Sequence, residues 1–124
     1  MEALIIAPTE VSPEINFNAE SGIFKMEGKS FMENTLAFYE KIETWLTEYS
    51  ESPTEKTILN IYLSYYNSST FREILSILMK FKQLKESGNK ILIKWGYDSK
   101  DNLSHKKGTE LALLLQLPFE YIEK

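Results

Sequence analysis

The stretch TILNIYLSY at residues 57–65 decides the fold, because apolar side chains occupy every second position. This alternation is typical of a β-strand that turns one face to a core and the other to polar surroundings. We therefore expect a sheet with one apolar face. The predicted apolar face carries Leu59, Ile61, Leu63 and Tyr65, and the other face carries Asn60, Tyr62 and Ser64.

Toward the carboxyl end, the pattern changes twice between helix and strand. Apolar residues at helical spacing predict a helix over about 71–85, followed by a strand over 90–97. A last helix is expected over about 102–116, and residues 119–122 suit a short edge strand. Strands that alternate with helices in this way predict parallel pairing with helical crossovers.

Toward the amino end, the sequence predicts a hairpin of strands 14–18 and 23–27. The first dozen residues contain prolines and suit a loop or an edge segment at best. Ser30 and Glu33 have the spacing of a capping box, which predicts that the first helix begins at Ser30. Its apolar stripe continues to Tyr49.

These segments predict a single α/β domain that spans residues 1–124. Lysine, asparagine and serine on alternate strand positions favour helices mainly on one face of a mixed, mostly parallel sheet. By analogy, this architecture is similar to that of the anti-sigma-factor antagonist (STAS-type) domains.

Composition argues against several classes of function. The chain has no cysteine, one histidine and a net charge of −4, so thiol chemistry and nucleic-acid binding are not expected. We also expect no cofactor, no metal, no signal peptide and no membrane insertion, and therefore a soluble cytoplasmic protein that is not an enzyme. His105 is expected to be solvated, and Asp98, Asp101 and Glu110 lack the spacing of a metal site.

The candidate site is the polar stretch YYNSSTFRE at residues 65–73, where a strand gives way to a helix. The first turn of a helix stabilises an anion, so a phosphoryl group on Ser68 would be favourable there. The alternative is that these residues only cap the helix, and Thr70 and Glu73 again have capping-box spacing.

Parallel topology predicts a common edge for three segments. The carboxyl ends of parallel strands meet on one side of a sheet, where sites of open α/β sheets gather. The segments 28–30 and Tyr97-Asp98 are therefore expected to lie near Ser68.

Several short elements in this order and spacing resemble the SiaC family of bacterial regulatory phosphoproteins, which have a STAS-like fold. The resemblance spans nearly the whole chain. It rests on Ser12-Pro13-Glu14-Ile15-Asn16-Phe17 with Gly22, Gly28-Lys29-Ser30 with Glu33-Asn34, Phe38-Tyr39, Trp45-Leu46, Tyr65-Tyr66-Asn67-Ser68-Ser69 and Trp95-Gly96-Tyr97-Asp98.

The resemblance implies a non-catalytic switch that a Ser/Thr kinase phosphorylates and a PP2C-type phosphatase restores. It implies a diguanylate cyclase as output, and hence a role in cyclic di-GMP signalling and biofilm formation. The acceptor threonine of the family matches Ser68, with Ser69 and Thr70 as alternatives. Partner contacts are expected at Lys29, Tyr66, Asn67, Ser69, Tyr97 and Asp98, in a monomer or weak dimer.

Two departures from the family pattern stand out. Serine replaces the family's threonine, and residues 99–107 lack the usual acidic stretch. A constitutive adaptor, in which Ser68 is only a helix cap and exposed aromatics such as Tyr62 or Tyr66 bind the partner, is the alternative function. A small-molecule-binding or enzymatic domain is a third class.

Overall fold

Six strands and three helices follow one another in the computed structural model of the chain, which describes all of residues 1–124. They include every predicted helix and strand. The strands are β1 (Leu4–Ile6), β2 (Glu14–Asn18), β3 (Ile23–Ser30), β4 (Lys56–Tyr66), β5 (Lys90–Tyr97) and β6 (Phe119–Glu123). The helices are α1 (Thr35–Tyr49), α2 (Ser68–Glu86) and α3 (Asn102–Leu115).

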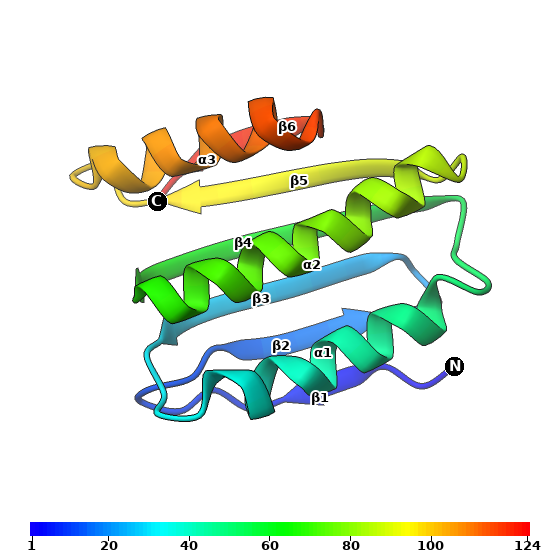
Figure 1. Cartoon of the computed structure of the whole chain (residues 1–124), viewed down its shortest axis with the longest axis horizontal. Helices are drawn as coiled ribbons and strands as arrows, with labels where there is room; N and C mark the ends of the chain where they lie inside the picture. Colours follow the sequence, from blue (N-terminus) through cyan, green and yellow to red (C-terminus); the bar gives the residue numbers. More distant parts are fainter.

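The six strands form one sheet whose spatial order is the order of the sequence, from β1 to β6 (Figure 1). β1 pairs with β2 and β2 with β3 in antiparallel fashion, whereas the three remaining neighbouring pairs are parallel. The sheet is thus mixed, and the prediction of a mostly parallel sheet was wrong. The prediction did not count β1, because a three-residue strand carries too few side chains for a recognisable alternation.

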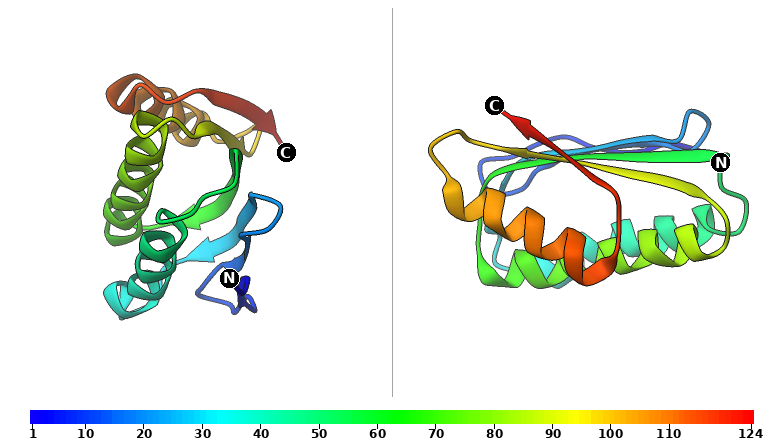
Figure 2. Two further views of the ribbon diagram at one scale, coloured as in Figure 1. Left: turned by 90° about the vertical axis from the view of Figure 1, so that its right-hand side faces the viewer. Right: turned by 90° about the horizontal axis from the view of Figure 1, so that it is seen from above.

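All three helices lie on the same face of the sheet, as the two turned views in Figure 2 show. Each helix connects a strand to its next parallel neighbour, in the order β3-α1-β4, β4-α2-β5 and β5-α3-β6. Crossovers of one hand, in a sheet that grows in one direction, place every helix on one side. The predicted one-sided cover is therefore confirmed.

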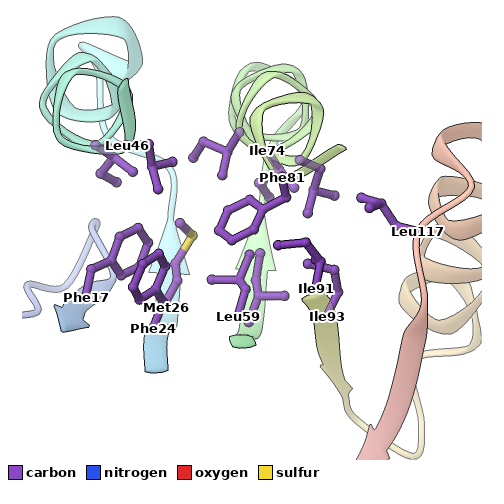
Figure 3. Packing of buried hydrophobic residues seen from close by; sticks show 14 of the residues in the cluster. Phe17, Phe24, Met26, Leu46, Leu59, Ile74, Phe81, Ile91, Ile93 and Leu117 are labelled. Carbon is purple, nitrogen blue, oxygen red and sulfur yellow. The ribbon is translucent and has the colours of Figure 1, made fainter. Parts of the chain in front are cut away.

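The core fills the space between the helices and the apolar face of the sheet (Figure 3). Phe17 and Phe24 stack with ring centroids 4.8 Å apart, and Trp45 of α1 meets both rings edge to face. Leu59, which follows the predicted alternation, is fully buried. Apolar burial of this kind is the main stabilising contribution to such a domain.

The first helix begins later than predicted, at Thr35, and its N-cap is Asn34. Strand β3 continues through Ser30, which is fully buried. The Ser30 hydroxyl lies 2.7 Å from the Thr70 hydroxyl, which belongs to another element. The capping-box prediction failed because this tertiary partner, forty positions away, holds the Ser30 side chain inside the protein.

A β-bulge near the end of β4 reverses the predicted orientation of Tyr65. Gly28 is opposite Leu63 and Lys29 is opposite Tyr65, so Ser64 is an extra residue in β4. Because a one-residue insertion exchanges the two faces of a strand, Tyr65 is 55% exposed, while Tyr66 is half-buried.

Candidate functional site

The start of α2 follows directly on β4 and forms the centre of the candidate site. Asn67 is the N-cap, and its Oδ1 accepts a hydrogen bond from the amide of Thr70 at 2.9 Å. The predicted Thr70–Glu73 capping box is absent, because Thr70 already lies inside the helix. The Glu73 side chain instead lies near Glu43 of α1, and partial burial and this repulsion raise the pKa of Glu73.

The three candidate hydroxyl groups have different surroundings. Ser68, the first residue of α2, is exposed. Ser69 is partly buried, and its Oγ lies 3.4 Å from Nη2 of Arg72. Thr70 is fully buried. Among the three, Ser68 has the side chain that an enzyme reaches without opening the fold.

Buried hydrogen bonds fix the first turn of α2 to the end of β3. The Thr70 hydroxyl donates to the carbonyl oxygen of Ser30 at 2.9 Å, and the amide of Asn67 donates to the same oxygen at 3.3 Å. The Ser30 hydroxyl lies 2.8 Å from the hydroxyl of Tyr39 on α1. We call Ser30, Tyr39 and Thr70 the hydroxyl cluster.

The hydroxyl cluster is shielded from solvent, since all three residues have no exposed surface. Burial raises the pKa of Tyr39 to about 12, against the smaller lowering by its hydroxyl partners. A buried polar group without a partner costs about 1–3 kcal/mol. The cluster therefore holds α1, α2 and β3 in one arrangement beneath Ser68.

The electrostatic surroundings of Ser68 favour an added anion. The first turn of the 19-residue α2 contains no acidic residue, and its cap is the neutral Asn67. The amides at a helix start carry a partial positive charge, which here no carboxylate in the turn offsets. Arg72 lies one turn further on, within reach of Ser69.

Tyr66 lies at this site and extends it toward α3. Its ring stacks on Phe71, with centroids 6.4 Å apart, and Lys107 of α3 lies over the Phe71 ring at 5.0 Å. Burial raises the pKa of Tyr66, while the Ser104 side chain of α3 opposes that shift.

The other predicted partner residues are more widely spread. Lys29 is exposed and is opposite Tyr65 in the sheet. The Asp98 carboxylate accepts a hydrogen bond of 3.0 Å from the Tyr62 hydroxyl. Tyr62 lies between the buried Ile61 and Leu63 in β4, so its side chain is on the face of the sheet away from the helices. Tyr97 packs against His105. The structure thus brings Ser30 and Asn67 together, whereas no hydrogen bond joins Ser68 to Tyr97 or Asp98.

An exposed aromatic pair beside the site has no counterpart in the sequence-based prediction. The rings of Phe31 and Tyr65 meet edge to face at 5.4 Å, and their exposures are 40% and 55%. The amide of Phe31 donates to the carbonyl oxygen of Val11, whose side chain is also exposed. No local signal reveals this pair, because the bulge at Ser64 turns Tyr65 outward.

The prediction that the His105 side chain is solvated was wrong. The side chain is partly buried, with the Tyr97 ring 4.6 Å away and the Tyr121 ring 5.2 Å away. No group of three or more His, Asp or Glu side chains is arranged to hold a metal ion. None of the helices combines the length and the apolar character that a membrane-spanning helix needs.

Comparison with known proteins gives consistent results. An uncharacterized protein of Pseudomonas aeruginosa (strain UCBPP-PA14) is 23% identical over 119 residues, which cover 96% of this chain and 94% of that protein. Apo-SiaC from P. aeruginosa superposes with a TM-score of 0.90 at 22% identity, over 98% and 99% of the two chains.

A second solved structure contains the diguanylate cyclase SiaD of P. aeruginosa in complex with its activator SiaC. It matches with a TM-score of 0.90 at 21% identity, over 98% of this chain and 99% of that chain. The model of the SiaC family of regulatory phosphoproteins matches residues 6–124. The chain therefore belongs to the SiaC family of regulatory phosphoproteins.

Proposed function

We propose that this protein is a non-catalytic switch in which phosphorylation of Ser68 selects the bound partner. One observation carries the proposal: Ser68 combines an exposed hydroxyl with the first position of a capped helix whose first turn has no acidic residue. A phosphoryl group there adds about −1.5 to −2 charges next to the partial positive charge of the helix start.

The proposed docking surface surrounds Ser68. It includes Lys29, Tyr66, Asn67 and Ser69, and it continues toward α3 to Tyr97 and Asp98. The exposed Phe31–Tyr65 pair supports this assignment, because aromatic side chains are frequent anchors of protein interfaces. Phosphate on Ser68 would place a strongly hydrated anion beside these apolar rings. It would thereby weaken the binding of a partner that covers them.

The rigid support beneath Ser68 favours a local rather than a global switch. Because the hydroxyl cluster is buried and fully paired, the added charge acts mainly on the surface and not on the packing of α2. A partner would therefore recognise the charge at a fixed position.

The family membership supports the proposed partners. We propose a Ser/Thr kinase and a PP2C-type phosphatase that set the state of Ser68, and a diguanylate cyclase as output, in the cytoplasm. SiaC of P. aeruginosa is described as the activator of the diguanylate cyclase SiaD. By extension, the unphosphorylated form here would bind such an enzyme and affect cyclic di-GMP signalling and biofilm formation.

The test begins with mass spectrometry of the purified protein after incubation with magnesium-ATP and a lysate of the source cells. We expect phosphate on Ser68 and none on the Ser68→Ala variant, with Ser69→Ala as the matched control that remains modified. Phosphate on Ser69 alone would move the acceptor by one residue. No phosphate on any of these residues would contradict the switch.

Binding to a purified diguanylate cyclase of the same organism tests the output. We expect Ser68→Ala to bind like the wild type, and Ser68→Asp or the phosphorylated protein to bind more weakly. Equal binding of all forms would favour the constitutive adaptor. The cap geometry of Asn67 supports that alternative, since a helix start needs such a cap with or without a switch.

A further inference from the structure

A hollow of about 300 Å³ lies over β3 to β6. Its central residues alternate with buried core residues along the strands and so face away from the helices, which all lie on the other side of the sheet (Figure 2). The size of the hollow is at the lower end of the range for small-molecule pockets. Strands β3 to β6 and the residue after β6 contribute its walls. The central residues are Lys25, Asn60, Tyr62, Lys94, Gly96 and Lys124.

The register of the sheet explains the hollow. Asn60 is opposite Lys25 on one side and Lys94 on the other, so a short side chain lies between two long ones. In the next row, Tyr62 is opposite Gly96, which has no side chain. Ile122 is opposite Gly96 on its other side. Each of the two rows therefore has a short or missing side chain between longer ones, which leaves a depression in the sheet surface.

Gly96 also lets a cation approach an aromatic ring. A Cβ atom at position 96 would lie 2.9 Å from Cβ of Tyr62 and 3.0 Å from Cε of Lys124, which is closer than such atoms pack. Without it, Nζ of Lys124 lies 5.4 Å from the centre of the Tyr62 ring. The hydrogen bond from Tyr62 to Asp98 restrains that ring.

The lining of the hollow has more lysines than carboxylates, although the carboxylates of Glu14, Asp98 and Glu120 border it. Three lysines and one glutamate line it, whereas the chain has a net charge of −4. Lys25 is paired with Glu14 and Glu27 at 3.1 and 3.3 Å. Lys94 and Lys124 form no ion pair, so two ammonium groups remain for a ligand.

We propose that this hollow binds a small organic anion with a flat apolar body. The two unpaired ammonium groups would hold a carboxylate, sulfonate or phosphate group through charge-assisted hydrogen bonds. The Tyr62 ring and the side chains of Ile23 and Ile122 supply apolar surface for the body of the ligand. The proposal is independent of the phosphorylation of Ser68.

The test is a titration of the isotope-labelled protein with 2-naphthoate, followed by amide chemical shifts. We expect saturable shifts centred on Asn60, Lys94 and Gly96, with little change at the start of α2. Neutral 2-naphthamide, which has the same body, should bind at least about tenfold more weakly, a difference of about 1.4 kcal/mol. Equal binding of the two compounds, or no saturable shift, would overturn the proposal.

Matched lysine variants separate the hollow from the general charge of the protein. Lys94→Gln with Lys124→Gln should weaken naphthoate binding about tenfold, equal to about 1.4 kcal/mol. The control, Lys41→Gln with Lys82→Gln, removes the same charge from α1 and α2 and should bind like the wild type. A comparable loss in both double variants, or unchanged binding in the first, would contradict the assigned site.

Discussion

The first turns of α2 and α3 are built alike but differ in charge and in the first residue. Asn67 caps α2 through the amide of Thr70, and Asp101 caps α3 through the amide of Ser104, both at 2.9 Å. Thr70 and Ser104 are both buried. At the first helical position, however, α2 has a serine and α3 has Asn102.

The charge of the cap distinguishes the two helix starts electrostatically. Asp101 brings its own carboxylate to the positive end of α3, whereas the neutral Asn67 leaves the corresponding field of α2 without an anion. An exposed hydroxyl is present only at the start of α2. Cap geometry alone is thus not evidence of a site, and the comparison with α3 identifies what is special about Ser68.

The largest expected effect concerns the buried hydroxyl under α2. Thr70→Val keeps the shape of the side chain but leaves the Ser30 carbonyl and hydroxyl short of a partner, which should lower the free energy of unfolding by about 2 kcal/mol. Urea denaturation measures this difference. The exposed Ser68→Ala is the control and should change the value by less than about 0.5 kcal/mol. A similarly small effect of Thr70→Val would mean that the hydroxyl cluster does not stabilise the helix start.

A smaller effect follows from pH. The pKa of Tyr39 is about 12 in the folded protein, against an ordinary value of about 10 in the unfolded chain. Its stabilisation is therefore fully present below pH 10 and is lost as pH rises toward 12, by about 1.4 kcal/mol per pH unit at most. Urea titrations at pH 9 and pH 11 should show a decline that Tyr39→Phe reduces by about 1 kcal/mol.

Tyr66→Phe is the comparison for this experiment, because Tyr66 lies beside Ser104 under α3 and is only half-buried. Its substitution should alter the pH dependence less. If the free energy of unfolding falls equally between pH 9 and pH 11 in the two variants, the two tyrosines contribute equally to the pH dependence, and the two helix starts do not differ in it.

The smallest expected effect comes from exchanging the cap charges. Asn67→Asp should stabilise the unphosphorylated protein by about 0.5 kcal/mol, and Asp101→Asn should destabilise it by a similar amount. Phosphorylation of Ser68 should reverse the first gain, since a carboxylate and a phosphate would then share one helix start. Thermal unfolding of both states, at low and high salt, measures this. A gain that persists after phosphorylation would place the phosphate away from the helix field.

Periodicity predicted the sheet and its one-sided cover because those features depend on which side chains are apolar. Residues 14–18 and the alternation at Leu59 need no tertiary information. The bulge at Ser64 does, because it is set by how Gly28 and Leu63 pair across two strands. Tyr65 was therefore assigned to the wrong face.

The starts of α1 and α2 were misjudged for a related physical reason, whereas the predicted start of α3 at Asn102 is confirmed. A serine or threonine hydroxyl serves equally well as a helix cap or as a buried hydrogen-bond partner. Ser30 and Thr70 were both interpreted as caps, yet they contact each other inside the protein. The asparagines that form the caps lie about one turn away in sequence: Asn34 follows Ser30 by four residues, and Asn67 precedes Thr70 by three. The proximity of Ser30 and the α2 start follows from parallel strands, whereas the aromatic pair of Phe31 and Tyr65 required the structure.

The order of the strands has a consequence for how the chain is made. Each strand neighbours the one before it in the sequence. As the chain leaves the ribosome, every new strand can therefore pair with the strand that was synthesised just before it. No strand must be inserted between two that have already paired. Each parallel pair closes a crossover that contains a helix, yet its two strands are consecutive in the sequence, so the pairing is more local than in a sheet with a shuffled strand order. During synthesis, α2 and its serine therefore leave the ribosome before the last edge strand, β6, is available to pair with β5.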